Sequence, residues 1–160
     1  MAEEHPLTDR ADAAAFDPYE MVRAFHERFD VAIAPRPARQ DAETHALRSR
    51  LIREEADEAL AALATGDIAE IAQELADVLY VTYGTAVSLG IDIRPVFAAV
   101  HAANMAKVGG VKRADGKVLK PPGWRPPDIR AILEAQGGAG DPSANTQPSG
   151  NGTATPSRGL

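Results

Sequence analysis

Residues 54–77, EEADEALAALATGDIAEIAQELAD, contain the end of one helix, a tight turn and the start of a second helix. Gly66 is suited to the C-cap of the first helix, and Asp67 is suited to the N-cap of the second. The two helices are predicted over residues 41–64 and 68–89. An antiparallel hairpin brings their acidic groups level, because each group lies roughly two turns from the connection. The stretch therefore predicts a helical hairpin with facing carboxylates.

The acidic residues of the first helix lie along an apolar line. With Leu47 as the zero of a helical wheel at about 100° per residue, Leu51 falls at about 40° and Glu58 at about 20°. On the same wheel Glu54 falls at about −20° and Glu55 at about 80°. The glutamates thus occupy a face that should bury hydrocarbon. On a single helix, a solvated surface is the ordinary explanation of such a group.

The second helix adds Glu74 and Asp77, which are spaced i, i+3 and share one face. Carboxylates that converge between helices raise one another's pKa, and burial raises it further. A hard divalent cation resolves this conflict, because Mg²⁺ and Mn²⁺ prefer oxygen ligands and keep water or phosphate in their shell. The two helices together predict a metal site. Its candidate residues are Glu54, Glu55, Glu58, Glu74 and Asp77.

The spacing leaves open which of these carboxylates is a general base and which are ligands. A ferritin-like di-iron site is excluded, because that site requires Glu-x-x-His pairs on two helices. Neither Glu58 nor Asp77 is followed by a histidine three residues later.

Composition favours a helical protein. Of the 160 residues, 44% are hydrophobic and only 5% are aromatic, so a core must rest on aliphatic side chains. The absence of cysteine excludes disulfides and thiolate zinc sites. The net charge of −6 argues against binding to a nucleic acid polymer. Because there is no apolar run of membrane-spanning length and no signal-peptide pattern, we expect a soluble cytoplasmic protein without a membrane partner.

Helix signals divide the chain into three parts. A flexible N-terminal segment is expected over residues 1–16, a helical domain over 17–136 and a disordered tail over 137–160. Further helices of the domain are predicted over residues 17–29, 92–108 and 128–136. Four main helices with short connections favour an all-α fold of the four-helix bundle type.

The helix over residues 41–64 carries a second apolar group, roughly opposite the line of Leu47. This group comprises Ile52, Ala56, Leu60 and Leu63. A helix that is buried on two sides has neighbours on both. The four helices of one short chain are too few to supply them, so we expect a homo-oligomer, either a dimer or a tetramer.

Positive charge is concentrated after the fourth helix. Asn104 and Lys107 share a face with apolar residues of that helix, and the loop over residues 109–127 is rich in lysine and arginine. Metal-bound carboxylates together with lysines suit a nucleoside polyphosphate. The candidate substrate-binding residues are Asn104, Lys107, Lys120, Trp124 and His26. Plainer roles compete, since Lys107 can snorkel, Trp124 can pack the loop and His26 can belong to the core.

Several motifs together resemble the all-α nucleoside triphosphate pyrophosphohydrolases, the MazG-like group. The acidic motifs are EEADE (54–58) and ELAD (74–77). Four further segments resemble the MazG-like dUTP diphosphatase subgroup: FHERF (25–29), ADVLYVTYGTAVSLGID (76–92), VHAANMAKVGG (100–110) and DGKVLKPPGWRPPDI (115–129). The likeness covers about residues 16–133.

This resemblance implies hydrolysis between the α- and β-phosphates, which yields a nucleoside monophosphate and pyrophosphate with Mg²⁺ or Mn²⁺. It implies that Glu55, Glu58, Glu74 and Asp77 ligate the metal. It also implies that Glu54 orients or deprotonates the attacking water, that Lys107 and Lys120 meet the phosphates, and that Asn104 lies near the sugar or base. Members of the group commonly form dimers or tetramers.

Three hypotheses follow. The first is a pyrophosphohydrolase that cleans the nucleotide pool, with dUTP favoured as substrate through the subgroup likeness. The second is a phosphoribosyl-ATP pyrophosphohydrolase, which shares the acidic motifs. The third is a non-catalytic helical interaction protein whose carboxylates hold a structural ion.

Overall fold

The structure is a computed structural model that describes residues 16–138, and all of its regular elements there are helices. The helices are α1 (Pro18–Arg28), α2 (Ala42–Thr65), α3 (Ile68–Ser88), α4 (Ile93–Met105) and α5 (Ile129–Ala135). The all-α prediction is therefore confirmed. Apart from Phe16, Gly137 and Gly138, the predicted flexible segment and the predicted disordered tail lie outside the described residues.

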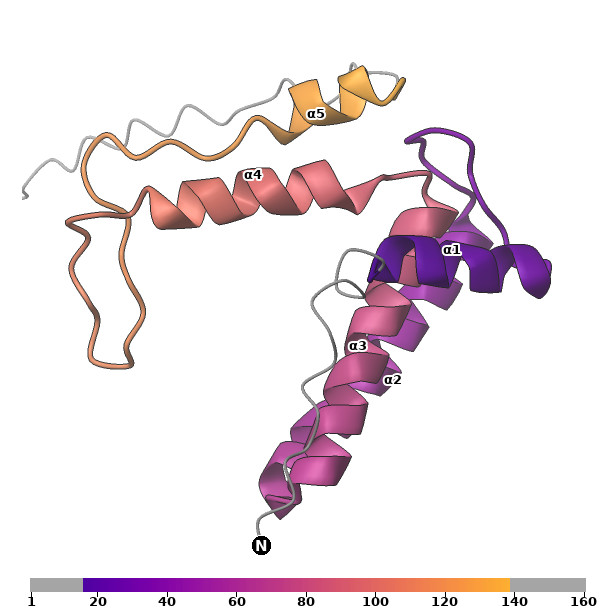
Figure 1. Cartoon of the computed structure of the whole chain (residues 1–160), viewed down its shortest axis with the longest axis horizontal. Coiled ribbons are helices and arrows are strands. Elements are labelled where there is room, and N and C mark those ends of the chain that lie inside the picture. Colours follow the sequence, from indigo (N-terminus) through magenta and orange to yellow (C-terminus); the bar gives the residue numbers. More distant parts are fainter. Residues whose placement is uncertain (1–15, 139–160) are drawn as a thin grey trace, which may run out of the picture.

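The hairpin of α2 and α3 forms as its turn residues predict. Gly66 ends α2 in the left-handed conformation, with φ of 78°. Asp67 begins α3, and its carboxylate accepts hydrogen bonds from the backbone N–H groups of Ala69 and Glu70. The two helices pack against each other along the hairpin (Figure 1). This connection fixes the register that places the two acidic groups opposite each other.

Helix α1 packs against α3 near the end of the hairpin that is remote from its turn (Figure 1). Asp17 caps α1 by accepting hydrogen bonds from the N–H groups of Tyr19 and Glu20. The apolar core is small and lies at this end, where Tyr19 packs with Ala86 and Val87. Helix α1 does not pack against the rest of the hairpin, toward its turn (Figure 1).

The chain bends by 119° between α3 and α4, so α4 diverges from the hairpin (Figure 1). Arg94, at the start of α4, holds this junction through ion pairs with Asp17 at 2.6 Å, Asp92 at 2.8 Å and Glu20 at 3.3 Å. Its guanidinium also lies 4.9 Å from the ring centroid of Tyr19. The described residues of one chain thus form a three-helix unit from which α4 projects as an arm, rather than a closed four-helix bundle.

Helix α5 runs beside α4 and is tied to its N-terminus. The side chain of Gln136 accepts a hydrogen bond from the N–H of Asp92 at 3.0 Å and donates one to its carbonyl at 2.9 Å. The loop between α4 and α5 contains a short turn, in which the N–H of Gly116 bonds to the carbonyl of Arg113 at 2.8 Å and Lys112 pairs with Val118.

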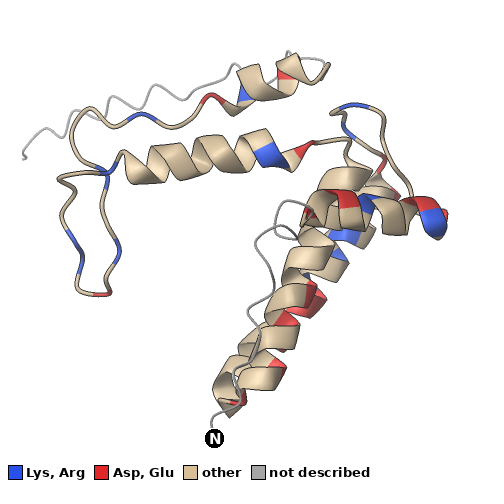
Figure 2. Ribbon diagram, in the orientation of Figure 1, with Lys and Arg blue, Asp and Glu red and all other residues tan. Residues whose placement is uncertain are grey.

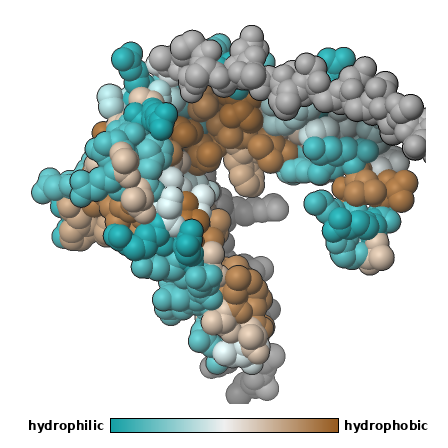
Figure 3. All heavy atoms as spheres, turned by 180° about the vertical axis from the view of Figure 1, so that it is seen from behind, coloured by the Kyte–Doolittle hydropathy of each residue, from teal (hydrophilic) through white to brown (hydrophobic). Residues whose placement is uncertain are grey.

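Large apolar side chains are exposed on the hairpin and on the α4 arm (Figure 3). On the hairpin, Leu60 is 66% and Leu79 58% exposed, and on the arm Phe97 is 70% and Met105 65% exposed. Between residues 16 and 138 no single helix is long and apolar enough to cross a membrane, and only the bent pair of α3 and α4 meets that criterion, by length and composition.

Candidate metal centre

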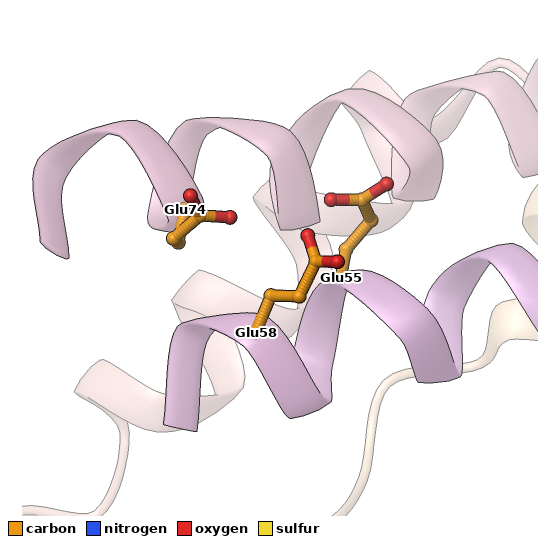
Figure 4. Close-up of side chains that lie close together, drawn as sticks. All are labelled: Glu55, Glu58 and Glu74. Atoms are coloured by element: carbon orange, nitrogen blue, oxygen red, sulfur yellow. The ribbon is translucent and has the colours of Figure 1, made fainter. Parts of the chain in front are cut away.

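Three carboxylates converge between α2 and α3. Glu55 and Glu58 come from α2 and Glu74 comes from α3, and their side chains point toward one another (Figure 4). One oxygen of each lies within 4.8 Å of the others. Glu55 and Glu74 are half-buried, whereas Glu58 is exposed. Three of the five predicted carboxylates therefore meet in one place, which we call the acidic cluster.

The other two carboxylates, Asp77 and Glu54, act on this cluster electrostatically. Burial raises the pKa of Glu55, and the negative charges of Glu58, Asp77, Glu74 and Glu54 raise it further, in that order. Burial also raises the pKa of Glu74, with Glu58, Asp77 and Glu70 adding to the effect. Among the described residues no cationic side chain offsets either shift. Negative charge is concentrated in the middle of the hairpin (Figure 2), and no ion pair with a cation of residues 16–138 balances it.

The donor set of the acidic cluster consists of oxygen atoms only, which matches hard divalent cations. Two ligands on opposite sides of Mg²⁺ lie about 4 Å apart, given Mg–O distances of about 2.0–2.1 Å. The carboxylate oxygens of the acidic cluster lie within 4.8 Å of one another, which allows a slightly wider spacing than this. Small rotations of the glutamate side chains would close the difference, so the residues fit a cation of this kind.

Four of the five predicted substrate-binding residues form a separate group at the far end of α4. The ammonium of Lys107 donates a hydrogen bond to the side-chain oxygen of Asn104 at 2.7 Å. The indole N–H of Trp124 donates to the carbonyl of Ala103 at 2.7 Å, and the Lys120 ammonium lies 4.4 Å from the centroid of a Trp124 ring. We call Asn104, Lys107, Lys120 and Trp124 the arm cluster.

The arm cluster and the acidic cluster are not brought together within one chain. No hydrogen bond or ion pair connects them in the part of the chain that the structure describes. Because α4 diverges from the hairpin, its C-terminal end points away from the middle of α2 and α3 (Figure 1). The hydrogen bond from Trp124 to Ala103 fastens the loop to α4, which is the packing role given above as the plainer alternative for this residue.

His26 lies inside the junction of the helices. It is 3% exposed, and its Nδ1 is 3.1 Å from the carbonyl oxygen of Ala32. Burial lowers the pKa of His26, and the nearby Arg48 guanidinium lowers it further against the opposing hydrogen bond to Ala32. The imidazole is therefore neutral at pH 7, and its position matches that of a core residue.

Arg48 is a polar residue that the sequence interpretation missed. It is 8% exposed, and its Nε is enclosed without a hydrogen-bond partner. Burial lowers the pKa of its guanidinium. Arg48 lies seven residues before Glu55 and therefore faces nearly the same direction on a helical wheel. This shared face was the signal in the sequence that could have identified Arg48. Its burial depends on α1, which no pattern within α2 reveals.

The fold and the acidic cluster together define an all-helical protein with a candidate divalent-cation site between two antiparallel helices. A family model described as phosphoribosyl-ATP pyrophosphohydrolase matches residues 22–104, more than half of the 160-residue chain. The chain belongs to the phosphoribosyl-ATP pyrophosphohydrolase family, and the matched region contains both acidic motifs. A search of curated proteins finds no match.

Family membership confirms the resemblance to the all-α pyrophosphohydrolases and supports an enzyme that hydrolyses a nucleotide with release of pyrophosphate. It does not distinguish dUTP from phosphoribosyl-ATP as the substrate. The acidic cluster lies within the matched residues and agrees with a metal requirement for this chemistry.

Proposed function

We propose that the protein is a metal-dependent nucleoside triphosphate pyrophosphohydrolase, which cleaves the bond between the α- and β-phosphates. The observation that carries this proposal is the convergence of Glu55, Glu58 and Glu74 within 4.8 Å, inside a region that matches the pyrophosphohydrolase family. The products are a nucleoside monophosphate and pyrophosphate. Mg²⁺ or Mn²⁺ is the proposed cofactor, because every donor in the acidic cluster is an oxygen.

In this proposal Glu55, Glu58, Glu74 and Asp77 hold the metal, and Glu54 acts on the water. A cation bound there would neutralise the phosphate oxygens and lower the pKa of a coordinated water. Glu54 orients the attacking water and accepts its proton, while the bridging oxygen leaves with pyrophosphate. Glu54 is exposed on α2 next to Glu55 and contributes to the raised pKa of Glu55.

The proposed substrate is dUTP, which the reaction converts to dUMP and so removes from the nucleotide pool. This choice rests on the resemblance of residues 100–110 and 115–129 to the dUTP diphosphatase subgroup. Phosphoribosyl-ATP fits the family match equally well. The test is a panel of dUTP, the other deoxynucleoside triphosphates and phosphoribosyl-ATP with Mg²⁺, and the products are resolved by chromatography. Release of orthophosphate in place of pyrophosphate would refute the bond assignment.

A non-catalytic role is the alternative, in which the carboxylates hold a structural ion. Glu54→Gln distinguishes the two, because it removes the proton acceptor and keeps the other carboxylates. We expect the variant to lose turnover and to bind Mn²⁺ with nearly unchanged affinity. Asp57→Asn, an exposed change on the same helix, is the matched control and should keep full activity. A wild-type protein that binds Mn²⁺ tightly but hydrolyses no nucleotide would establish the structural role.

We further propose that a second copy of the chain covers the exposed hairpin and completes the site. The support is the apolar surface on both the hairpin and the α4 arm, where Leu79 is 58% and Phe97 70% exposed. Charge complementarity adds to it, because no cation among residues 16–138 pairs with the acidic cluster and the arm cluster carries two lysines. An arm from the second copy would bring Lys107 and Lys120 to the phosphates.

Complementation between two inactive variants tests this composite site. In an assembly of Glu54→Gln and Lys107→Ala chains, one site carries both changes and the other carries neither. We expect mixing the two inactive proteins to restore activity after subunit exchange, and light scattering to show an assembly of at least two chains. A monomer at micromolar concentration, or a mixture that stays inactive although the subunits exchange, would contradict the proposal.

A further inference from the structure

Arg48 presents a buried cation for which the described residues offer no anion. The side chain is 8% exposed, and Nε is fully enclosed without an acceptor. In contrast to Nε, the two Nη atoms of the guanidinium are not fully enclosed. A buried charge without a partner costs several kcal/mol, and buried polar groups in native proteins nearly always have a partner. The Nη atoms of the guanidinium therefore remain available to an acceptor from outside these residues, whereas the enclosed Nε is not.

The groups around Arg48 do not supply that acceptor. A Cβ atom added to Gly84 of α3 would lie 3.4 Å from Nη1 of Arg48 and 3.2 Å from Nε2 of His26. Gly84 thus allows the guanidinium to lie directly against the backbone of α3. His26 is neutral and donates its Nδ1–H to the carbonyl oxygen of Ala32, and no hydrogen bond joins it to Arg48 among the described residues. Between residues 16 and 138 no carboxylate is paired with Arg48.

An exposed aromatic surface lies at the same junction. Phe25 of α1 contacts Tyr80 of α3 edge-on, with ring centroids 5.7 Å apart, and Phe29 is 4.6 Å from Phe25. Phe25 is 39% and Tyr80 40% exposed, so both rings keep open surface. Phe25 also neighbours His26 at 6.3 Å between centroids. The aromatic rings and the guanidinium therefore lie where α1, α2 and α3 meet.

Arg48 and Tyr80 lie on the same two helices as the acidic cluster, toward the end of the hairpin that is remote from its turn. Arg48 precedes Glu55 by seven residues on α2, and Gly84 follows Asp77 by seven residues on α3. Seven residues correspond to about 10 Å along a helix axis. Tyr80 lies between these two levels, one turn from Asp77. When phosphates are held at the acidic cluster, the sugar and base of the nucleotide span a similar distance.

We propose that this junction binds the nucleobase, with Tyr80 and Phe25 stacking on the ring and Arg48 donating a hydrogen bond to a base carbonyl. The inference rests on the proposed function and adds a substrate class to it. We expect this donor to favour uracil, which presents two carbonyl oxygens, over adenine, which presents only ring nitrogens as acceptors. Aromatic rings contribute affinity for any base because every base has a π-face.

The first test uses the wild-type protein and needs no variant that could misfold. The Nε–H of Arg48 is enclosed, so its proton exchanges slowly and is suited to ¹H–¹⁵N NMR; Arg48→Lys assigns the signal by its loss. With Mg²⁺ present, we expect dUMP to shift this resonance and 2-deoxyribose 5-phosphate, which lacks the base, to leave it in place. Equal shifts with both ligands, or no shift with millimolar dUMP, would overturn the inference.

The second test compares kinetics on dUTP and dATP. Arg48→Met should lower kcat/KM for dUTP by about 5- to 150-fold, the discrimination of one good base contact, and change dATP by less than about 3-fold. Arg53→Met on the exposed face of α2 is the matched control and should change neither. Equal losses on dUTP and dATP would show that Arg48 is structural and would overturn its assignment.

Tyr80→Leu tests the stacking surface at an exposed position. It should raise KM for both nucleotides by about 5- to 150-fold with kcat nearly unchanged, whereas Phe16→Leu, outside the aromatic group, should not. An unchanged KM for Tyr80→Leu would overturn the stacking assignment. A wild-type protein that hydrolyses no nucleotide would refute the proposed function itself, whereas hydrolysis with an unresponsive Arg48 would refute only the present inference.

Discussion

Glu55→Gln should stabilise the protein without metal and weaken its response to metal. The pKa of Glu55 is raised in the folded state, mainly by burial and by Glu58 and Asp77. A carboxyl group whose pKa is raised on folding costs stability when it is ionised. This cost is absent below the ordinary pKa of 4.5, where the group is protonated in both states, and is complete above the raised pKa. Glutamine removes it, so the variant should melt higher than wild type at pH 8.

Added Mn²⁺ should favour the wild type instead, because the variant loses part of the stabilisation that bound metal provides. Binding to the folded state alone stabilises it by about 2.7 kcal/mol when free metal is at a hundredfold of Kd. For a chain of this size, each kcal/mol raises Tm by about 2–4 °C, which gives a shift of about 5–11 °C. Glu55 shares the acidic cluster with Glu58 and Glu74, so its replacement removes one of three converging carboxylates. A tenfold loss of affinity in Glu55→Gln would halve the stabilisation to about 1.4 kcal/mol.

Differential scanning calorimetry at pH 8, with and without Mn²⁺, measures both effects. Asp57→Asn is the matched control, because it removes one charge from an exposed position on the same helix and should keep the full response to Mn²⁺. The reasoning is refuted if Glu55→Gln retains the wild-type Mn²⁺ shift, or if Asp57→Asn loses it to the same extent.

Three further predictions concern the scaffold. Gly90→Ala should cost at least about 3 kcal/mol in urea denaturation, combining left-handed strain with overpacking, because the backbone has φ of 70° and the new Cβ would clash with the Arg36 carbonyl oxygen. Gly66→Ala, with φ of 78° and no atom within 4 Å, should cost only about 1–2 kcal/mol. Because burial lowers the pKa of His26, the free energy of unfolding should fall as pH decreases from 6.5 toward the lowered pKa. The difference in this free energy between wild type and His26→Gln should change by at most about 1.4 kcal/mol per pH unit. A difference that does not depend on pH would contradict the prediction. Arg94→Gln should accelerate hydrogen exchange in α4 and α5 while α2 and α3 keep their protection, since Arg94 holds the junction through three carboxylates; unchanged exchange in α4 would count against this role.

The hairpin and the acidic cluster could be predicted because their determinants are local. Gly66 and Asp67 set the turn within two residues, and helical periodicity then places Glu55 and Glu74 on facing surfaces. The helix predicted over residues 17–29 is confirmed as α1, and its start is likewise local, because Asp17 caps it. Local patterns suffice where one residue fixes the backbone of its neighbours.

The direction of α4 and the environment of Arg48 could not be predicted in this way. Arg94 pairs with Asp17, 77 residues earlier in the chain, and that contact sets where the arm points. Arg48 is buried only because α1 packs over the end of the hairpin and Gly84 lets the guanidinium approach α3. Both features depend on tertiary contacts that leave no periodic signal in the sequence.

The most direct measurement is a ³¹P NMR time course of dUTP with Mg²⁺, recorded for the wild-type protein and for Glu54→Gln. The acidic hairpin should convert each triphosphate into one monophosphate and one pyrophosphate, with the reaction stopped by EDTA and abolished in the variant. Orthophosphate as the first product, turnover that survives EDTA, or full activity in Glu54→Gln would contradict the account.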